Sequence, residues 1–185
     1  SDLVQEAVGH PRLFITGGEP LLQAGALCEF LRKYRECRAN EAKEVILQTN
    51  GTIHSKEVLP YVDLLSIDIK TPGSGESPDL DVLDAYLEYS HSAPRTQVKM
   101  LITSEEDFDY AMAAAWEVWK RNRTTQIIIG ATNRTPAHPA GVKELGDMLR
   151  KQREWCEAFL ATDWPPTARF LPQYHVLLFG NRKGV

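Results

Sequence analysis

Cysteines are scarce in this sequence, and their placement excludes several kinds of protein. The 185 residues contain three, Cys28, Cys37 and Cys156. An odd number without regular spacing argues against a disulfide framework, and no pair has the spacing of metal ligands. Cys28 and Cys37 would face nearly opposite sides of one helix. We therefore predict that all three are packing or surface residues in a reducing, cytoplasmic setting.

Long apolar runs and an excess of positive charge are also absent. No apolar stretch could span a membrane and no secretory signal is present, so we expect no membrane partner. Lys and Arg number 21 against 25 Asp and Glu, and the net charge of −4 argues against a nucleic-acid surface. Without internal repeats or low-complexity segments, positions 1–185 fit a single domain.

What the sequence does contain is an alternation of strand and helix patterns. Strands are predicted at 12–16, 44–48, 62–70, 95–103, 125–130 and 168–171. Helices are predicted at 21–38, 80–89, 105–121 and 142–160, with a helix tail at 1–10 and a short helix at 55–59 capped by Ser55. The run Ile127-Ile128-Ile129 is expected of a parallel strand buried on both faces. Alternation of this kind predicts an α/β fold with a parallel sheet.

The segment Thr16-Gly17-Gly18-Glu19-Pro20 follows the first predicted strand. Two glycines permit a sharp turn and leave no Cβ between the backbone and a ligand, while Pro20 suits the first turn of a helix. Glu19 is then fixed at the carboxyl end of a strand, the usual ligand position in α/β sheets, where a carboxylate can pair with a ligand ammonium. On its own, the segment fits an ordinary strand-to-helix turn equally well.

Polar residues also gather at the ends of the next strands. The second predicted strand ends in Gln48-Thr49-Asn50-Gly51, and the fourth contains Lys99. The third carries Ser66, Asp68 and Lys70 on one face. Alone, this alternation fits a solvated edge strand or a structural Asp68–Lys70 pair. Together with Lys99 and the two glycine turns, it favours a polar, ligand-binding interior or rim of a barrel.

Most histidines lack the spacing of partners in a site. His54, His91 and His138 lie near predicted loops, and we predict that they are solvated. His175 differs, because it follows Pro172-Gln173 directly after the last predicted strand.

Taken together, these strand ends resemble the radical S-adenosylmethionine superfamily. The segment 16–20 matches its Gly-Gly-Glu-Pro motif, which binds the methionine amino group in that superfamily. Segments 47–52 and 66–70 resemble the next two strand ends. The resemblance implies an α/β fold of the partial (incomplete) TIM-like (β/α) barrel type, with parallel strands and the first βα unit missing.

Two further segments, 67–75 and 169–185, resemble the 7-carboxy-7-deazaguanine synthase branch of that superfamily. The resemblance extends from Arg12 to Val185. It implies that S-adenosylmethionine is bound by Gly17, Gly18, Glu19, Thr49, Asn50, Ser66, Asp68, Lys70 and Gln173. It implies substrate contacts from Thr16, Lys99 and His175.

The sequence departs from the family pattern in two ways. The Cys-X3-Cys-X2-Cys loop that holds a [4Fe–4S] cluster is missing, and the chain begins one βα unit late, as a missing N-terminal segment would explain. Gln48 stands where an acidic residue is usual, which puts a cation site there in doubt. We therefore expect the cluster and Mg²⁺ only in the intact protein, and we expect this chain alone to be inactive.

For the intact protein, the resemblance implies reductive cleavage of S-adenosylmethionine to a 5′-deoxyadenosyl radical. The radical would convert 6-carboxy-5,6,7,8-tetrahydropterin to 7-carboxy-7-deazaguanine, with loss of ammonia, for queuosine or archaeosine biosynthesis. The expected partners are the small pterin substrate, an electron donor such as flavodoxin or ferredoxin, and a second copy in a homodimer. Two alternatives stay open: a glycyl-radical-enzyme activase of the same superfamily, and a cluster-free binding module or fragment.

Overall fold

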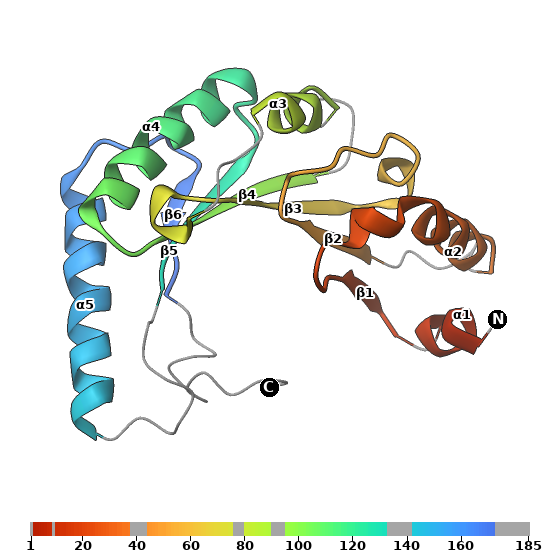
Figure 1. Ribbon diagram of the computed structural model, residues 1–185, viewed down its shortest axis with the longest axis horizontal. Helices are drawn as coiled ribbons and strands as arrows, with labels where there is room; N and C mark the ends of the chain where they lie inside the picture. Colours follow the sequence, from red (N-terminus) through yellow and green to blue (C-terminus); the bar gives the residue numbers. More distant parts are fainter. Residues whose placement is uncertain are drawn as a thin grey trace.

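Six parallel strands form the centre of the part of the molecule that the structure describes. The computed structural model describes residues 2–8, 10–37, 44–75, 80–89, 95–132 and 142–172 (Figure 1). The strands are β1 (Arg12–Ile15), β2 (Glu44–Thr49), β3 (Leu64–Ile69), β4 (Arg95–Ile102), β5 (Gln126–Ala131) and β6 (Ala168–Phe170). Each strand pairs in parallel with the next along the chain, so their order in the sheet is β1-β2-β3-β4-β5-β6. All their carboxyl ends therefore lie at one edge of the sheet.

Helices connect these strands and cover one face of the sheet. They are α1 (Asp2–Val8), α2 (Ala24–Glu36), α3 (Leu80–Tyr89), α4 (Glu105–Arg121) and α5 (Val142–Ala161), with short 3₁₀ turns η1 (Pro20–Gln23), η2 (Leu59–Tyr61) and η3 (Pro72–Ser74). Figure 1 shows the sheet curving, with α2 to α5 along the outside of the curve. Within the described ranges, no helix covers the inner face.

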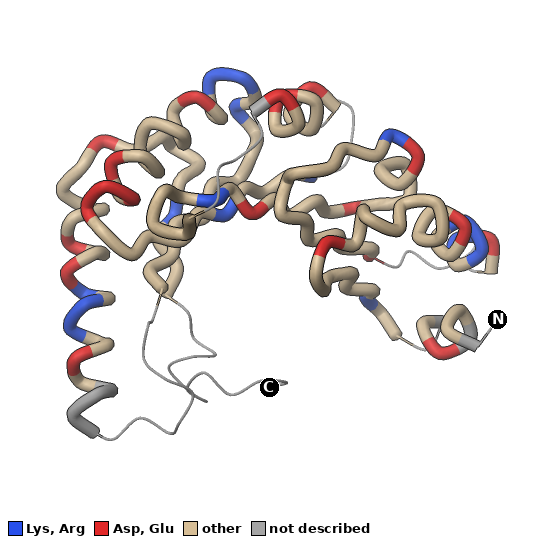
Figure 2. Tube along the Cα trace, viewed as in Figure 1, with Lys and Arg blue, Asp and Glu red and all other residues tan. Residues whose placement is uncertain are grey.

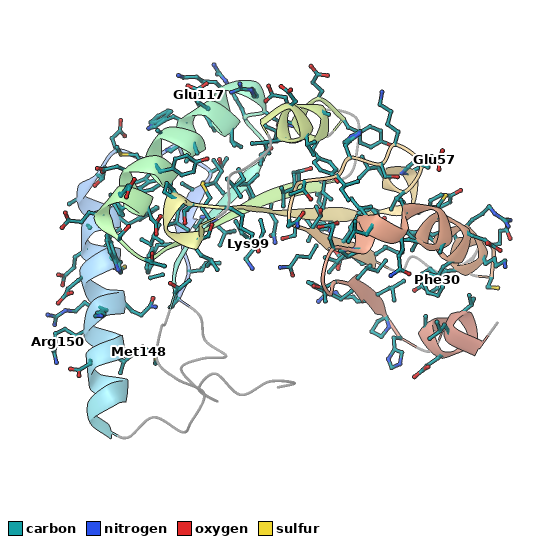
Figure 3. The ribbon with its side chains drawn as sticks, viewed as in Figure 1. Phe30, Glu57, Lys99, Glu117, Met148 and Arg150 are labelled. Carbon is teal, nitrogen blue, oxygen red and sulfur yellow. The ribbon has the colours of Figure 1, made fainter. Side chains whose placement is uncertain are left out.

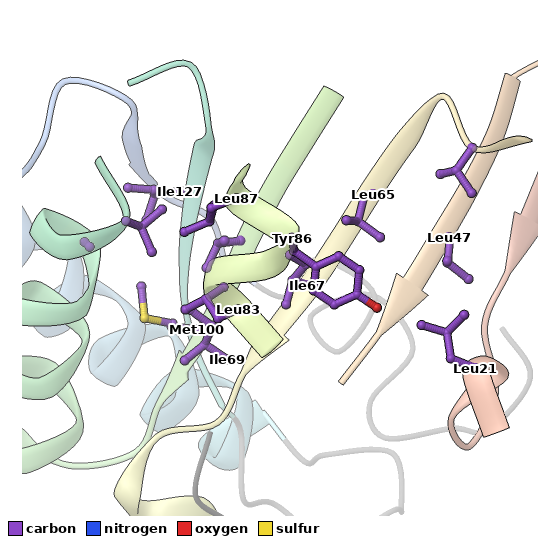
Figure 4. Packing of buried hydrophobic residues seen from close by; sticks show 14 of the residues in the cluster. Leu21, Leu47, Leu65, Ile67, Ile69, Leu83, Tyr86, Leu87, Met100 and Ile127 are labelled. Carbon is purple, nitrogen blue, oxygen red and sulfur yellow. The ribbon is translucent and has the colours of Figure 1, made fainter. Parts of the chain in front are cut away.

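The hydrophobic core lies between the sheet and these helices. Its largest fully buried side chains are Tyr34, Tyr86, Leu31, Leu47, Leu59, Leu65, Ile67, Leu87, Met100, Ile102, Ile127 and Ile129. Figure 4 shows Tyr86 of α3 packing over β3 beside Ile67. Burying one such side chain contributes about 1.5–3 kcal/mol, so this face of the sheet is the main source of stability.

The charges on α4 match the helix dipole. Acidic residues occupy its first turn and Lys120 and Arg121 its last, a distribution visible in Figure 2. The Ser104 side chain caps the first turn by accepting a hydrogen bond from the Asp107 amide at 3.2 Å. The sequence-based prediction of this helix, 105–121, is confirmed to the residue.

Two local predictions from sequence are wrong. Ser55 does not cap a helix: residues 56–58 form turns, η2 begins only at Leu59, and it is the Ser55 carbonyl that accepts bonds from the Val58 and Leu59 amides. Strand β5 is not buried on both faces. Ile127 and Ile129 are fully buried against the helices, but Ile128 is only half-buried because it lies on the inner face, in register with Lys99.

The predicted α/β class and parallel sheet are confirmed, with strand boundaries within two residues of those expected. Sequential parallel strand order is what a barrel segment would have, but the partial barrel itself stays a prediction. None of the helices in the described ranges is long and apolar enough to cross a lipid bilayer.

Candidate functional site

Glu19 is held rigidly at the carboxyl end of β1. Gly17 has φ 139°, a conformation open to glycine, and this lets the chain turn between the strand and η1. Glu19 is the N-cap of η1, its carboxylate accepting a hydrogen bond from the Leu21 amide at 3.0 Å, and Pro20 occupies the first helical position. The predicted turn and the predicted placement of the carboxylate are both observed.

The end of the neighbouring strand, β2, also holds the Glu19 carboxylate. The Thr49 hydroxyl lies 3.0 Å from each carboxylate oxygen, and the Asn50 amide donates to Oε2 at 2.8 Å. The Asn50 side chain itself accepts bonds from the amide and hydroxyl of Thr52. Thr49 is 2% exposed, so its hydroxyl is committed to this cluster. Thr49 and Asn50, predicted as cofactor-lining residues, are placed here as supports for Glu19.

Tyr86 braces the loop after β2 from the helix side. It is fully buried, and its hydroxyl donates a hydrogen bond to the Ile53 carbonyl. Burial raises the pKa of Tyr86, and the negative charge of Glu19 raises it further, while the contact with Thr49 acts in the opposite direction. The Tyr86 hydroxyl therefore stays protonated and available as a donor.

His54 is only partly exposed, whereas the sequence predicts a solvated side chain. Its ring lies edge-on to Tyr86 with 4.8 Å between centroids, and its Nε2 atom is buried without a hydrogen-bond partner. Burial lowers the pKa of His54, and the positive charge of Lys56 lowers it further. His54 is thus a neutral packing residue at neutral pH. His91 and His138 lie outside the described residues.

A second group of polar side chains lies on the inner face of β3 and β4. The buried Ser66 hydroxyl accepts a hydrogen bond from the Gln97 amide nitrogen at 2.8 Å, and Asp68 lies in register with Lys99. Figure 3 shows Lys99 on the side of the sheet away from α4. Asp68, Lys70 and Lys99 line a hollow of about 140 Å³, together with Ile69, Thr71, Ser74, Leu101, Thr103 and Thr132. The structure thus brings together three of the predicted site residues.

Asp68, which lines this hollow, has one unsatisfied buried oxygen. Its Oδ1 atom is buried and accepts no hydrogen bond. Among the described residues, no ion pair joins Asp68 to Lys70 or Lys99, so the structural Asp68–Lys70 pair considered from sequence does not form. A buried acceptor without a donor is costly.

Asp107 is a buried carboxylate beside this hollow that the sequence analysis did not single out. It is 0% exposed and accepts hydrogen bonds from the Gly73 amide at 2.6 Å, the Thr103 amide at 2.8 Å and the Thr103 hydroxyl at 2.5 Å. Burial tends to raise the pKa of Asp107, but these hydrogen bonds outweigh it and hold the pKa below its ordinary value. The signal that predicts Asp107 is the Ser-X-X-Asp spacing of residues 104–107, a capping pattern.

The remaining predicted site residues are placed as follows. Thr16 is exposed at the end of β1, and Gly18 is exposed with open space where a Cβ would be. Gln48 lies half-buried in register with Ser66 on the inner face. Gln173 and His175 lie outside the described residues.

The cysteines do not form a site within the described part of the chain. The Cys28 thiol donates to the Glu57 carbonyl at 3.4 Å, Cys37 is exposed after α2, and Cys156 lies on α5. Among the residues placed by the structure, no group of three His, Cys, Asp or Glu side chains could hold a metal ion. Their predicted role as packing or surface residues agrees with this placement.

Comparison with known proteins gives relatives of one kind. No protein-family profile matches the chain. The 7-carboxy-7-deazaguanine synthase of Geobacter sulfurreducens is 31% identical over 173 residues, covering 90% of this chain and 62% of that protein. The synthase of Methanospirillum hungatei is 33% identical over 97 residues, 52% of this chain and 37% of that protein. That of Bacillus subtilis is 26% identical over 189 residues, covering all of this chain and 72% of that protein.

The chain thus spans less than two thirds of the length of the first two of these relatives. The match to the Geobacter protein nevertheless covers most of the chain. This chain resembles the 7-carboxy-7-deazaguanine synthases.

Proposed function

We propose that this chain forms the ligand-binding face of a radical S-adenosylmethionine enzyme that makes 7-carboxy-7-deazaguanine from 6-carboxy-5,6,7,8-tetrahydropterin. The observation that carries the proposal is the Glu19 carboxylate, fixed at a strand end by Thr49, Asn50 and Leu21. The relatives are named as 7-carboxy-7-deazaguanine synthases, which suggests the reaction product. The neighbouring strand ends supply the rest of a polar, concave surface.

The residues at these strand ends fit S-adenosylmethionine. A carboxylate held by three donors at one orientation is suited to bind the methionine ammonium, because its direction is set before the ligand arrives. The exposed backbone at Gly17 and Gly18 leaves room for close approach. When bound, S-adenosylmethionine would supply the group that abstracts hydrogen from the substrate.

The hollow between β3 and β4 fits polar, anionic ligand groups. We assign the Asp68 carboxylate, which lines the hollow, to accept a hydrogen bond from a ligand hydroxyl or amine. Lys70 and Lys99, which make no ion pair within the described ranges, offer positive charge to a carboxylate. The ligand and the substrate proposed here each carry a carboxylate, and Lys99 is assigned to the substrate side as the sequence predicted.

A [4Fe–4S] cluster does not fit the three cysteines of this chain. Cys28 lies within α2 and Cys37 directly follows it, whereas Cys156 lies on α5 at the opposite end of the sheet (Figure 1). Three thiolates gathered at one point are needed to hold such a cluster. For this chain, we therefore propose only that it binds and orients the ligands. Four expectations stay predictions: that this chain alone is inactive, that the intact protein uses Mg²⁺, that flavodoxin or ferredoxin donates its electrons, and that it forms a homodimer.

Binding of S-adenosylmethionine to the purified chain tests the proposal. Isothermal titration calorimetry on the wild type, Glu19→Gln and Glu57→Gln separates the site from general surface charge, since Glu57 is exposed on the turn before η2. We expect Glu19→Gln to weaken binding by about tenfold or more, the loss of one charged hydrogen bond. We expect Glu57→Gln to bind like the wild type.

Equal affinity in Glu19→Gln and the wild type would contradict the assignment of Glu19. Absence of binding by the wild type would contradict the proposal as a whole. For the substrate side, Lys99→Met should weaken binding of the tetrahydropterin while leaving S-adenosylmethionine affinity within about twofold, because only one of the two ligands would contact that lysine.

A further inference from the structure

The loop after β3 is one wall of the hollow that contains Asp68 and Lys70. Thr71 and Ser74 of this loop line it. The loop is closed on itself, with the Ser74 amide donating to the Thr71 carbonyl at 2.9 Å and the Gly75 amide to the Pro72 carbonyl at 3.0 Å. The buried Thr71 hydroxyl donates to the Leu101 carbonyl of β4 at 2.8 Å. The shape of the hollow therefore depends on how this loop is fastened to β4.

Asp107 of α4 holds the loop in place through hydrogen bonds. Its carboxylate accepts from Gly73 in the loop after β3 and from Thr103 in the loop after β4, and so joins the two loops. Asp107 is fully buried and does not line the hollow. Ser104 caps the helix that carries it, which fixes the position of its backbone.

Gly73 is the residue that permits this contact. A Cβ built there would lie 2.5 Å from Asp107 Oδ2 and 2.5 Å from the Thr103 hydroxyl. Any side chain at this position would therefore displace either the loop or the Asp107 and Thr103 side chains that hold it. Gly73 therefore lets the loop approach α4, and Asp107 holds the loop there.

We propose that Asp107 is a positioning residue for the ligand site, acting through the loop 71–75 on the wall of the hollow. The proposal rests on the function proposed above, because it assigns S-adenosylmethionine as the ligand beside that wall. Asp107 does not touch the ligand. It fixes Thr71 and Ser74, and with them the backbone that follows Lys70.

The fastening itself is tested by amide hydrogen exchange of Asp107→Asn, which keeps the side-chain shape. Asp109→Asn on the same helix is the matched control, because Asp109 is exposed. We expect at least one of the Gly73 and Thr103 amides to exchange about tenfold faster in Asp107→Asn, since asparagine keeps one acceptor oxygen and replaces the other with an NH2 donor. Both amides should exchange as in the wild type in Asp109→Asn. Unchanged exchange at both amides in Asp107→Asn overturns the proposal.

Its effect on the ligand site is tested by a double-mutant cycle on S-adenosylmethionine affinity. We expect Asp107→Asn to weaken binding about fivefold to tenfold, and to weaken it much less in a Lys70→Met background, because the loop and Lys70 act as one unit. Combined with Lys99→Met, the same change should be additive. Additivity in both backgrounds indicates a general loss of structure and overturns the positioning role.

Gly73→Ala gives an independent check, with Gly146→Ala on α5 as its control because open space surrounds that glycine. Gly73→Ala should weaken binding in the same direction as Asp107→Asn, and Gly146→Ala should leave it unchanged. If the wild type does not bind S-adenosylmethionine, the proposed function is contradicted. The role of Asp107 in the affinity for that ligand is then contradicted as well. The exchange measurement does not depend on that ligand and still decides whether Asp107 holds the loop.

Discussion

The Thr49 hydroxyl lies 3.0 Å from both carboxylate oxygens of Glu19, a residue 30 positions earlier in the chain. This contact joins the ends of two neighbouring parallel strands, β1 and β2. Because Thr49 is buried and Glu19 is also held by two backbone amides, the carboxylate keeps one orientation without a ligand. Such preorganisation lowers the entropic cost of binding.

Thr49→Val should distinguish the contribution of the Thr49 hydroxyl to stability from the contribution of its side-chain volume. The valine keeps the β-branched shape but leaves Glu19 without one donor, so we expect a loss of about 1–2 kcal/mol in the free energy of unfolding. Urea denaturation followed by circular dichroism measures it. Thr49→Val should also weaken the binding of S-adenosylmethionine. Thr49→Ser, which keeps the hydroxyl, should keep most of the wild-type affinity. If the valine and serine variants bound equally, the hydroxyl would have no part in orienting Glu19.

Gly51 should be intolerant of a side chain. Its φ is 74°, and a Cβ there would lie 3.0 Å from the Ile67 side chain, so both the backbone and the packing resist alanine. We expect Gly51→Ala to lower the free energy of unfolding by about 1–3 kcal/mol. Gly25→Ala in α2 is the control, because open space surrounds Gly25 and alanine favours a helix by roughly 0.5–1 kcal/mol. The two variants should therefore move the urea midpoint in opposite directions.

His54 should make the protein less stable in mild acid. Burial holds the pKa of His54 in the folded chain below its ordinary value of 6.5, so the unfolded chain binds a proton at higher pH than the folded chain does. The contribution of the neutral His54 ring to the free energy of unfolding is fully present above about pH 6.5. It decreases as the pH falls below that value. Urea midpoints at several pH values between 7.5 and 5.5 should fall more steeply for the wild type than for His54→Gln. Parallel curves would show that His54 does not titrate differently in the two states.

The α/β class and the strand positions could be predicted from the sequence because they depend on local patterns. Strand β3 shows this most clearly: Leu65, Ile67 and Ile69 are buried against helices, while Ser66 and Asp68 lie on the other face. Alternation along a strand carries that information directly. The glycine turn before Glu19 was equally readable, since a φ of 139° at Gly17 requires glycine.

Long-range contacts could not be predicted in the same way. Nothing local tells that the Asn50 backbone amide, and not its side chain, binds Glu19. His54 sits in a segment that looks like an exposed loop, yet Tyr86 from α3 packs against its ring. Asp107 has the spacing of a capping residue, but its bond to Gly73 depends on how two loops meet. In each case the deciding partner lies more than 30 residues away.

The cysteines give the last prediction. Anaerobic reconstitution of this chain with iron and sulfide should yield no stoichiometric [4Fe–4S] cluster. Cys28 donates its thiol hydrogen to the Glu57 carbonyl, and Cys156 lies on a helix at the other end of the sheet, so one cluster could not reach both without unfolding the chain. Iron and sulfide analysis with visible absorption measures the result. A triple Cys→Ser variant is the control for adventitious iron and should give the same low values. A full cluster that is lost in that variant would falsify this account of the cysteines and would show that they gather at one site.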